Sequence, residues 1–215
     1  MPQADTTSGS PTTSSTTKRK LPKQRANESR MIDAAVTLLE EHPVSEVTNA
    51  AVASVSRTQP SYVTRYFGSR DEFLLAVAEE LARRIADRNL GLRVLLASPE
   101  GNSRFTGIFA IPEVESWFKL WRYLVGTDLL DRSPRQGDGP LLTAGIDNLQ
   151  AQLGFPPEEA RTWALVTLIS VLGFRVSGGV LGITPEESGA VADKVIDALL
   201  RDAEHYRNDS PAPEA

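Results

Sequence analysis

The chain has 215 residues, 40% apolar and 24% charged, which is enough to bury a hydrophobic core in one or two domains. It has no cysteine, which excludes disulfides and thiolate metal sites, and its two histidines are too far apart in sequence to suggest a metal site. No segment is apolar over the roughly 18 residues of a membrane span, and the N-terminus lacks the apolar core of a signal peptide. We therefore expect a cytoplasmic protein with no membrane partner, metal or other cofactor.

The net charge of −5 is unevenly distributed along the chain. Residues 1–70 hold nine Lys and Arg against six Asp and Glu, whereas residues 71–215 hold fourteen against twenty-two. This asymmetry is typical of a basic binding module on an acidic body. The first seventeen residues are rich in Ser, Thr and Pro and have too little apolar surface to fold, and a dense basic segment follows them. We expect residues 1–24 to be a disordered tail whose basic arm either contacts phosphates or is a solvated linker.

Helical periodicity predicts three short helices in the next part of the chain. The first is expected from Asn27, as its N-cap, to about Glu41. The second is expected to start at Thr48, whose hydroxyl can cap free N–H groups, with Val52, Ala53 and Ser56 facing inward. A tight turn over residues 57–59 follows, and Pro60 suits the first position of the third helix because its missing N–H has no helical partner there.

The remaining predicted elements are also helices. Ser69 and Glu72 have the spacing of a capping box, which predicts a long fourth helix over residues 70–96. A second capping box, Thr184 with Glu187, predicts the start of the last helix. The other expected helices cover residues 104–111, 112–130, 141–153 and 157–181, and the last one runs to about residue 207. The sequence thus predicts an all-α protein, in which an N-terminal three-helix domain is joined by a long helix to a C-terminal helical bundle.

The three short helices form the pattern of a helix-turn-helix, in which the third helix lies in the DNA major groove. Val63 and Phe67, four residues apart, would form the buried side of this third helix. Hydroxyl groups on its other side can contact bases or phosphates, and an arginine can bind guanine or hold a phosphate. Any small three-helix unit would share this spacing, so the pattern alone leaves DNA binding open. The residues on or near the exposed face are Pro60, Ser61, Tyr62, Thr64 and Arg65.

The segment Val47–Val77, VTNAAVASVSRTQPSYVTRYFGSRDEFLLAV, resembles the DNA-binding region of TetR-type (tetracycline-repressor-like) transcriptional regulators. That family has a threonine at the start of the second helix and a Tyr-Phe pair at the end of the third. A Gly-Ser-Lys-acidic step then leads into a long connecting helix. Thr48, Tyr66-Phe67 and Gly68-Ser69-Arg70-Asp71 match these features without a gap. Upstream, RMIDAAVTLLEEH is similar to the family's first helix, and the rest of the chain matches only in size and helical character.

The resemblance implies that Thr48, Tyr66 and Arg70 hold DNA phosphates. The sequence departs from the family pattern at the turn. Arg57 stands where the family usually has a glycine, and Gln59 stands where it usually has a capping serine. A left-handed conformation would cost Arg57 about 1 kcal/mol, so either the turn is altered or the arginine tolerates this strain in order to reach a phosphate. The DNA-binding candidates are Thr48, Arg57, Gln59, Pro60, Ser61, Tyr62, Thr64, Arg65, Tyr66 and Arg70.

The last two predicted helices carry a candidate dimer interface. Small residues recur at three- and four-residue spacing in the first of them, and an apolar stripe runs along the second. Both patterns also fit an internal core, but the resemblance implies a homodimer through these two helices, so that two half-sites are read. The residues concerned are Ser170, Gly173, Ser177 and Gly178, followed by Val191, Val195, Ala198 and Leu199.

The resemblance also implies that the helical body binds a small effector. Aromatic residues in this region either belong to a plain core or line an apolar cavity, which would favour a hydrophobic ligand. The effector must prefer the DNA-incompetent state in order to shift the equilibrium. The ligand-binding candidates are Phe105, Phe109, Trp117, Phe118, Trp121, Tyr123, Trp163 and Phe174.

The expected function is that of a DNA-binding transcriptional regulator, a ligand-responsive repressor that binds a palindromic operator as a dimer. A protein-binding adaptor that kept the fold and lost DNA binding is the alternative, which the unusual turn leaves open. An enzyme is not expected, because the sequence has no His-carboxylate motif, Gly-rich phosphate loop or serine elbow. The expected domains are a tail (1–24), the helix-turn-helix (25–70), a ligand-binding and dimerisation domain (71–207) and a second disordered tail (208–215).

Overall fold

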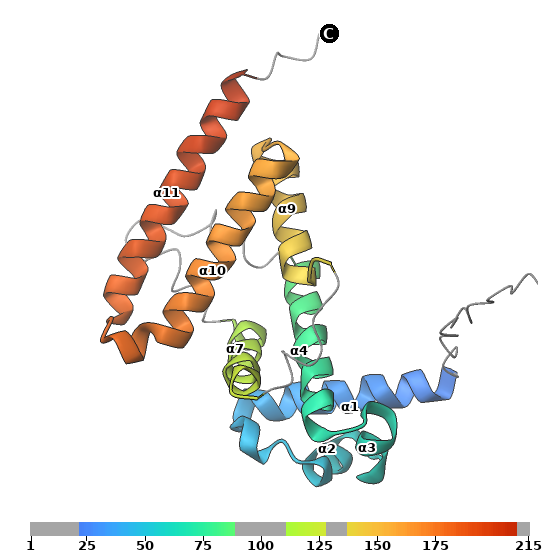
Figure 1. Cartoon of the computed structure of the whole chain (residues 1–215). Helices are drawn as coiled ribbons and strands as arrows, with labels where there is room; N and C mark the ends of the chain where they lie inside the picture. The colour runs from blue at the N-terminus through green and yellow to red at the C-terminus, as the bar shows by residue number, and fades with distance from the viewer. Residues whose placement is uncertain (1–21, 89–110, 128–136, 210–215) are drawn as a thin grey trace, which may run out of the picture.

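The computed structural model describes residues 22–88, 111–127 and 137–209 (Figure 1). Within these ranges the chain is helical and has no strand, so the predicted all-α fold class is confirmed. None of the helices in these ranges is long and apolar enough to cross a membrane. The elements are α1 (Pro22–Glu41), the 3₁₀ turn η1 (Val44–Glu46), α2 (Asn49–Ser56), α3 (Ser61–Phe67), α4 (Arg70–Asp87), α7 (Pro112–Val125), α9 (Pro140–Leu153), α10 (Pro157–Leu181) and α11 (Pro185–Asp209).

Most predicted helix bounds agree with these to within a few residues, and the differences have local causes. α4 ends at Asp87, and residues 89–96 of its predicted range lie outside the described residues, as does most of the predicted helix over 104–111. α7 is shorter than predicted, because Gly126 closes it with an N–H bond to the Tyr123 carbonyl at 3.1 Å.

The first helix begins five residues earlier than predicted. α1 starts at Pro22, so Asn27 lies inside the helix and is not its N-cap. A proline is well tolerated there, because the first N–H groups of a helix have no helical partner. Asn27 is instead buried, with its Nδ2 3.5 Å from the hydroxyl of Tyr66 at the end of α3. Residues 22–24, which we predicted to be part of the disordered tail, are therefore helical.

α1, α2 and α3 form a small head at one end of the molecule (Figure 1). Its buried apolar side chains include Met31 of α1, Val52 of α2 and Val63 of α3, each fully buried. The predicted inward residues of α2, Val52, Ala53 and Ser56, are all buried. Phe67, predicted to be core, is half-buried and packs edge-on against Phe73 of α4, with ring centroids 4.9 Å apart.

A capping box starts α4, as the sequence predicts. The hydroxyl of Ser69 accepts a hydrogen bond from the Glu72 amide at 3.1 Å, and the Glu72 carboxylate accepts one from the Ser69 amide at 2.7 Å. These bonds satisfy two N–H groups that lack helical partners. Gly68, just before the box, has a φ of 95°, and a Cβ there would lie 2.3 Å from Glu72 Oε2, so glycine alone fits this step without rearrangement.

One hydrophobic core joins the head to α4 and α7. It contains Phe73, Leu74 and Val77 of α4, together with Leu120 and Leu124 of α7, all buried. The side chains of the head pack into this same cluster. The packing therefore crosses residue 70, where we predicted a domain boundary.

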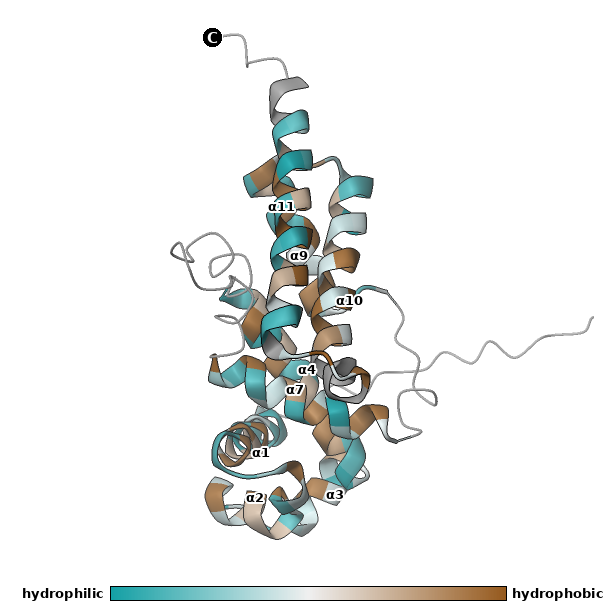
Figure 2. Ribbon diagram, turned by 90° about the vertical axis from the view of Figure 1, so that its left-hand side faces the viewer, coloured by the Kyte–Doolittle hydropathy of each residue, from teal (hydrophilic) through white to brown (hydrophobic). Residues whose placement is uncertain are grey.

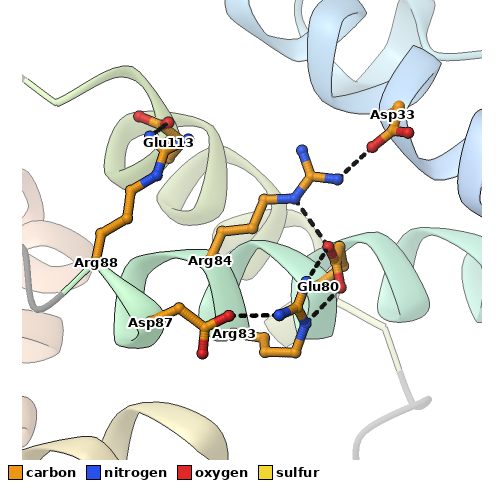
Figure 3. Close-up of polar contacts among 7 residues, drawn as sticks. All are labelled: Asp33, Glu80, Arg83, Arg84, Asp87, Arg88 and Glu113. Atoms are coloured by element: carbon orange, nitrogen blue, oxygen red, sulfur yellow. Dashed lines mark hydrogen bonds and ion pairs between the residues drawn. The ribbon is translucent and has the colours of Figure 1, made fainter.

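Ion pairs also fasten α4 to its neighbours (Figure 3). Arg84 pairs with Asp33 of α1 and with Glu80 one turn back on α4. Arg88, just after α4, pairs with Glu113 of α7. Each of these pairs is partly exposed and contributes on the order of 1 kcal/mol or less. Two of them link α4 and the residue after it to α1 and α7.

α9, α10 and α11 form the other end of the molecule, with their own core. Leu153 of α9, Ala164 of α10 and Leu199 of α11 are buried in it. The burial of Leu199 corrects our prediction that it belongs to a dimer interface, because its side chain is already used within the chain. The predicted capping box at the start of α11 is confirmed, with the Thr184 hydroxyl accepting from the Glu187 amide at 3.2 Å.

Candidate nucleic-acid interface

The interface candidate is built on α2, the turn after it and α3. Thr48 caps α2 as predicted, with its Oγ1 accepting a hydrogen bond from the Ala51 amide at 3.2 Å. Thr48 remains exposed, and so does the first turn of α2 at Ala50. A helix N-terminus with free N–H groups favours an anion, which suits a phosphate contact at this position.

The turn after α2 is closed by Arg57 in the left-handed conformation, with φ 54° and ψ 46°. The Thr58 amide donates to the Ala53 carbonyl at 3.0 Å, and the Arg57 amide donates to the Ser54 carbonyl at 3.4 Å. This is the hydrogen-bond pattern of a Schellman motif, with arginine in the position that glycine usually occupies. Arg57 thus adopts the left-handed conformation and the turn keeps its usual hydrogen bonds. Its side chain is exposed.

Replacing Arg57 with glycine should raise the free energy of unfolding by up to about 1 kcal/mol, because a left-handed conformation strains any residue with a Cβ. The same change should weaken DNA binding at every sequence if the arginine holds a phosphate. Thermal unfolding and a binding titration on the same variant check both effects. Arg57→Lys is the control, because it keeps both the strain and the charge. A glycine variant no more stable than wild type would show that the turn carries no strain.

The exposed face of α3 contains four of the predicted groove-facing residues. Pro60, with helical φ and ψ of −54° and −34°, leads into the helix. Gln59, just before it, is exposed and uses its carbonyl to accept from the Tyr62 amide at 2.9 Å. The four exposed residues are Pro60, Ser61, Thr64 and Arg65.

The two tyrosines of α3 are less available than we predicted. Both are half-buried and pack against the core of the head, with their ring centroids 5.3 Å apart. The hydroxyl of Tyr66 lies near Asn27, as described above. Both tyrosines therefore hold α3 against the core of the head, and both remain partly exposed.

Arg70, predicted to hold a DNA phosphate, is turned into the protein. Its Nη2 donates to the Val44 carbonyl at 2.6 Å, and its Nε to the Val47 carbonyl at 3.1 Å. Its Nη1 donates to the Tyr123 hydroxyl at 2.8 Å. All three guanidinium nitrogens thus have partners inside the protein. In this structure Arg70 ties α4 to η1 and α7, which differs from our prediction because these partners lie far from it in sequence.

Solved structures with a similar fold were found, although no protein-family model matches the sequence and no curated protein matches it significantly. The chain is similar to the multidrug binding protein EbrR complexed with imidazole, with a TM-score of 0.52 and 18% identity over 87% of this chain and 97% of that chain. It is also similar to the TetR family repressor AlkX from Dietzia sp. strain DQ12-45-1b, with a TM-score of 0.50 and 17% identity over 82% of this chain and 97% of that chain. The chain has the TetR-type fold.

This TetR-type fold separates the predicted ligand-binding residues into different places. Trp117, Phe118 and Trp121 of α7 lie together, with the Trp117 ring 5.1 Å from that of Phe118 and stacked at 5.6 Å on that of Trp121. Tyr123 points instead toward Arg70. Trp163 belongs to the core of α9, α10 and α11.

Trp163 also donates its Nε1 hydrogen to Asp202 of α11 at 2.7 Å, which ties α10 to α11. In this structure Trp163 thus packs in a different cluster from Trp117 and Phe118, whereas Tyr123 packs against the same core as Trp117. Phe174 is half-buried on α10, while Phe105 and Phe109 lie outside the described residues.

Sequence reasoning missed the structural part that Tyr123 plays in the TetR-type fold. Besides accepting from Arg70, its hydroxyl donates to Asp71 Oδ1 at 2.9 Å. The two partners are 53 and 52 residues away in sequence. No local pattern signals such a contact, because it depends on how α7 packs across the start of α4.

Proposed function

We propose that the protein is a DNA-binding transcriptional regulator, a ligand-responsive repressor that binds a palindromic operator as a dimer. The observation that carries the proposal is the exposed face of α3, where Ser61, Thr64 and Arg65 lie outside the core on the third helix of the head. The TetR-type fold supports it, because the repressor AlkX shares that fold. The Schellman hydrogen bonds at Arg57 also support it over the alternative of an adaptor that has lost DNA binding, because the turn between α2 and α3 is kept.

The test is a retardation assay with the DNA upstream of the protein's own gene, repeated across a salt series. A regulator should bind this duplex specifically, with an affinity that falls steeply as salt rises. Six to ten phosphate contacts would lower the affinity by about 10³- to 10⁵-fold between roughly 50 and 200 mM salt. A scrambled duplex of equal length is the control. Failure to bind any duplex at low salt would contradict the proposal.

The proposed dimer forms through α10 and α11. Apolar side chains remain exposed on both helices, with Ile169 of α10 64% and Val191 of α11 44% exposed. Figure 2 shows apolar segments along α10. A Cβ built at Gly173 would meet nothing within 4 Å, so this position is also open. A second copy of the chain would bury these residues and place two heads on one duplex.

Changing Ile169 to glutamate should therefore convert the protein to a monomer, because an unpaired charge would have to be buried in the interface. Sedimentation over a range of protein concentrations would show the change, and operator affinity should fall with it. Val125→Glu is the matched control, since Val125 of α7 is also exposed (51%) but lies outside the proposed interface. A wild-type protein that is monomeric at every concentration would contradict the dimer.

The proposed effector site lies where α4, α7, α9 and α10 meet. Ile85, Val114 and Phe118 are buried there, with Trp117 and Val171 packed against them. These apolar and aromatic side chains favour a hydrophobic small molecule. Binding would act on DNA affinity only through a difference in affinity for the two positions of the head.

A further inference from the structure

Arg70 lies at the junction between the head and the body. Its bonds to the Val44 and Val47 carbonyls hold both ends of η1, the turn that leads directly into the N-cap Thr48. The same guanidinium also bonds to Tyr123 on α7. A single side chain thus contacts both the segment before α2 and α7, the helix that lines the proposed effector site.

The Tyr123 end of this contact is equally specific. The one hydroxyl accepts from Arg70 and donates to Asp71, so both of its hydrogen-bonding roles are used. The Arg70 guanidinium carbon also lies 5.3 Å from the centroid of the Tyr123 ring. Bonds of this kind are directional and weaken steeply with misalignment. A small movement of α7 would therefore change how Arg70 holds η1.

α7 packs against both the proposed effector site and the head. Trp117, Phe118 and Trp121, which lie within two turns of Tyr123, pack toward the proposed effector site or stack beside it. From the other face of the helix, Lys119 donates to the Leu39 carbonyl near the end of α1 at 2.9 Å. This helix thus contacts the effector site on one side and the head on the other.

We propose that Arg70 and Tyr123 form a relay that couples the position of α7 to η1 and, through Thr48, to the N-terminus of α2 on the DNA-binding surface. Arg70 acts as a positioning residue and does not contact phosphate. The relay rests on the proposed function and supplies a mechanism for it: an effector that moves α7 changes the orientation of α2. By reciprocity, DNA bound to the head changes the surroundings of the α7 tryptophans.

The first experiment needs neither DNA nor effector. Tyr123→Phe removes the hydroxyl and keeps the ring, and amide hydrogen exchange is compared with wild type. Exchange at residues 46–48, whose amides bond within η1, should accelerate about fivefold or more. Exchange in the middle of α4 should stay unchanged, which excludes general destabilisation. Tyr206→Phe on α11 is the matched control. Equal exchange at 46–48 in all three proteins would overturn the relay.

The second experiment separates positioning from phosphate contact. Arg70→Gln and Tyr123→Phe should each weaken binding to the operator duplex about fivefold, and the double variant should be no weaker than Arg70→Gln alone. The salt dependence of all three should equal that of wild type. If Arg70 holds a phosphate, its variant would instead reduce the salt slope by about one, while Tyr123→Phe would bind normally, and the proposal would be wrong.

The third experiment tests reciprocity by tryptophan fluorescence in a Trp163→Phe background, in which the emission comes only from the two tryptophans of α7. Adding operator duplex should change the emission of this protein, and the change should be lost with Tyr123→Phe at saturating DNA. An unchanged response would overturn the coupling. If the wild type binds no DNA, the proposed function fails, whereas the exchange experiment still decides whether Tyr123 and Arg70 hold η1.

Discussion

Replacing Arg65 with alanine should weaken binding to the preferred operator by about 5- to 100-fold and relax the sequence preference at one base position, because an arginine that binds guanine contributes about 1–3 kcal/mol of discrimination. Arg65 is exposed on α3 beside Ser61 and Thr64, on the face that enters the major groove in this motif. Titrations of wild type and variant with the operator and with single-base variants of it measure the effect. Binding to a scrambled duplex should change much less.

Arg201→Ala is the matched control, because Arg201 is an exposed arginine on α11, far from the head. It should leave both affinity and preference unchanged. Thr64→Ala should likewise alter the preferred sequence, by a smaller factor. If Arg65→Ala weakens every duplex equally and lowers the salt slope by about one, Arg65 holds a phosphate and our assignment to base recognition is wrong.

Replacing Leu120 with alanine should lower the free energy of unfolding by about 2–5 kcal/mol and disable the head, although Leu120 lies fifty residues after the predicted DNA-binding domain. Its side chain is fully buried in the core shared by the head, α4 and α7. The loss is a large fraction of a typical stability of about 5–15 kcal/mol. Denaturant unfolding gives the energy, and amide exchange in α2 and α3 shows whether the head is loosened.

Val125→Ala, at an exposed position of the same helix, should change stability by less than about 0.5 kcal/mol. The two variants together test whether the head has a core of its own. If Leu120→Ala accelerated exchange only in α7 and the body, while α2 and α3 kept wild-type protection, the head would be an independent domain. The predicted boundary at residue 70 would then describe the folding units correctly.

Features set by neighbouring residues could be predicted from the sequence. The capping boxes at Ser69 and Thr184 join residues three apart, and both are present in the structure. Thr48 caps α2 as expected. The inward faces of the short helices follow from helical periodicity, which is a local property of the chain. Ser61, Thr64 and Arg65, which we predicted to lie on or near the exposed face of α3, are exposed.

Features set by distant residues could not be predicted. Arg70 matches a local family pattern that implies a phosphate contact, but its bonding partners lie more than twenty residues away on each side. The apolar stripe that contains Leu199 is compatible with either a dimer interface or an internal core. In the structure Leu199 packs with residues of α9 and α10, so it belongs to the core. Asn27 is a residue type that often caps helices, yet α1 begins at Pro22, and Asn27 is instead buried with its amide near the Tyr66 hydroxyl.

The sequence by itself determined that the protein is helical, where the helices with a local capping signal begin, and which face of α3 is polar, because these depend on side chains within one or two turns of each other. The tertiary structure alone decided what each polar residue contacts. Arg70 is only partly buried, and its guanidinium donates to the acceptors that the fold brings near: the Val44 and Val47 carbonyls and the hydroxyl of Tyr123. The head and α7 thereby became one packed unit, a property that no segment of the chain encodes alone.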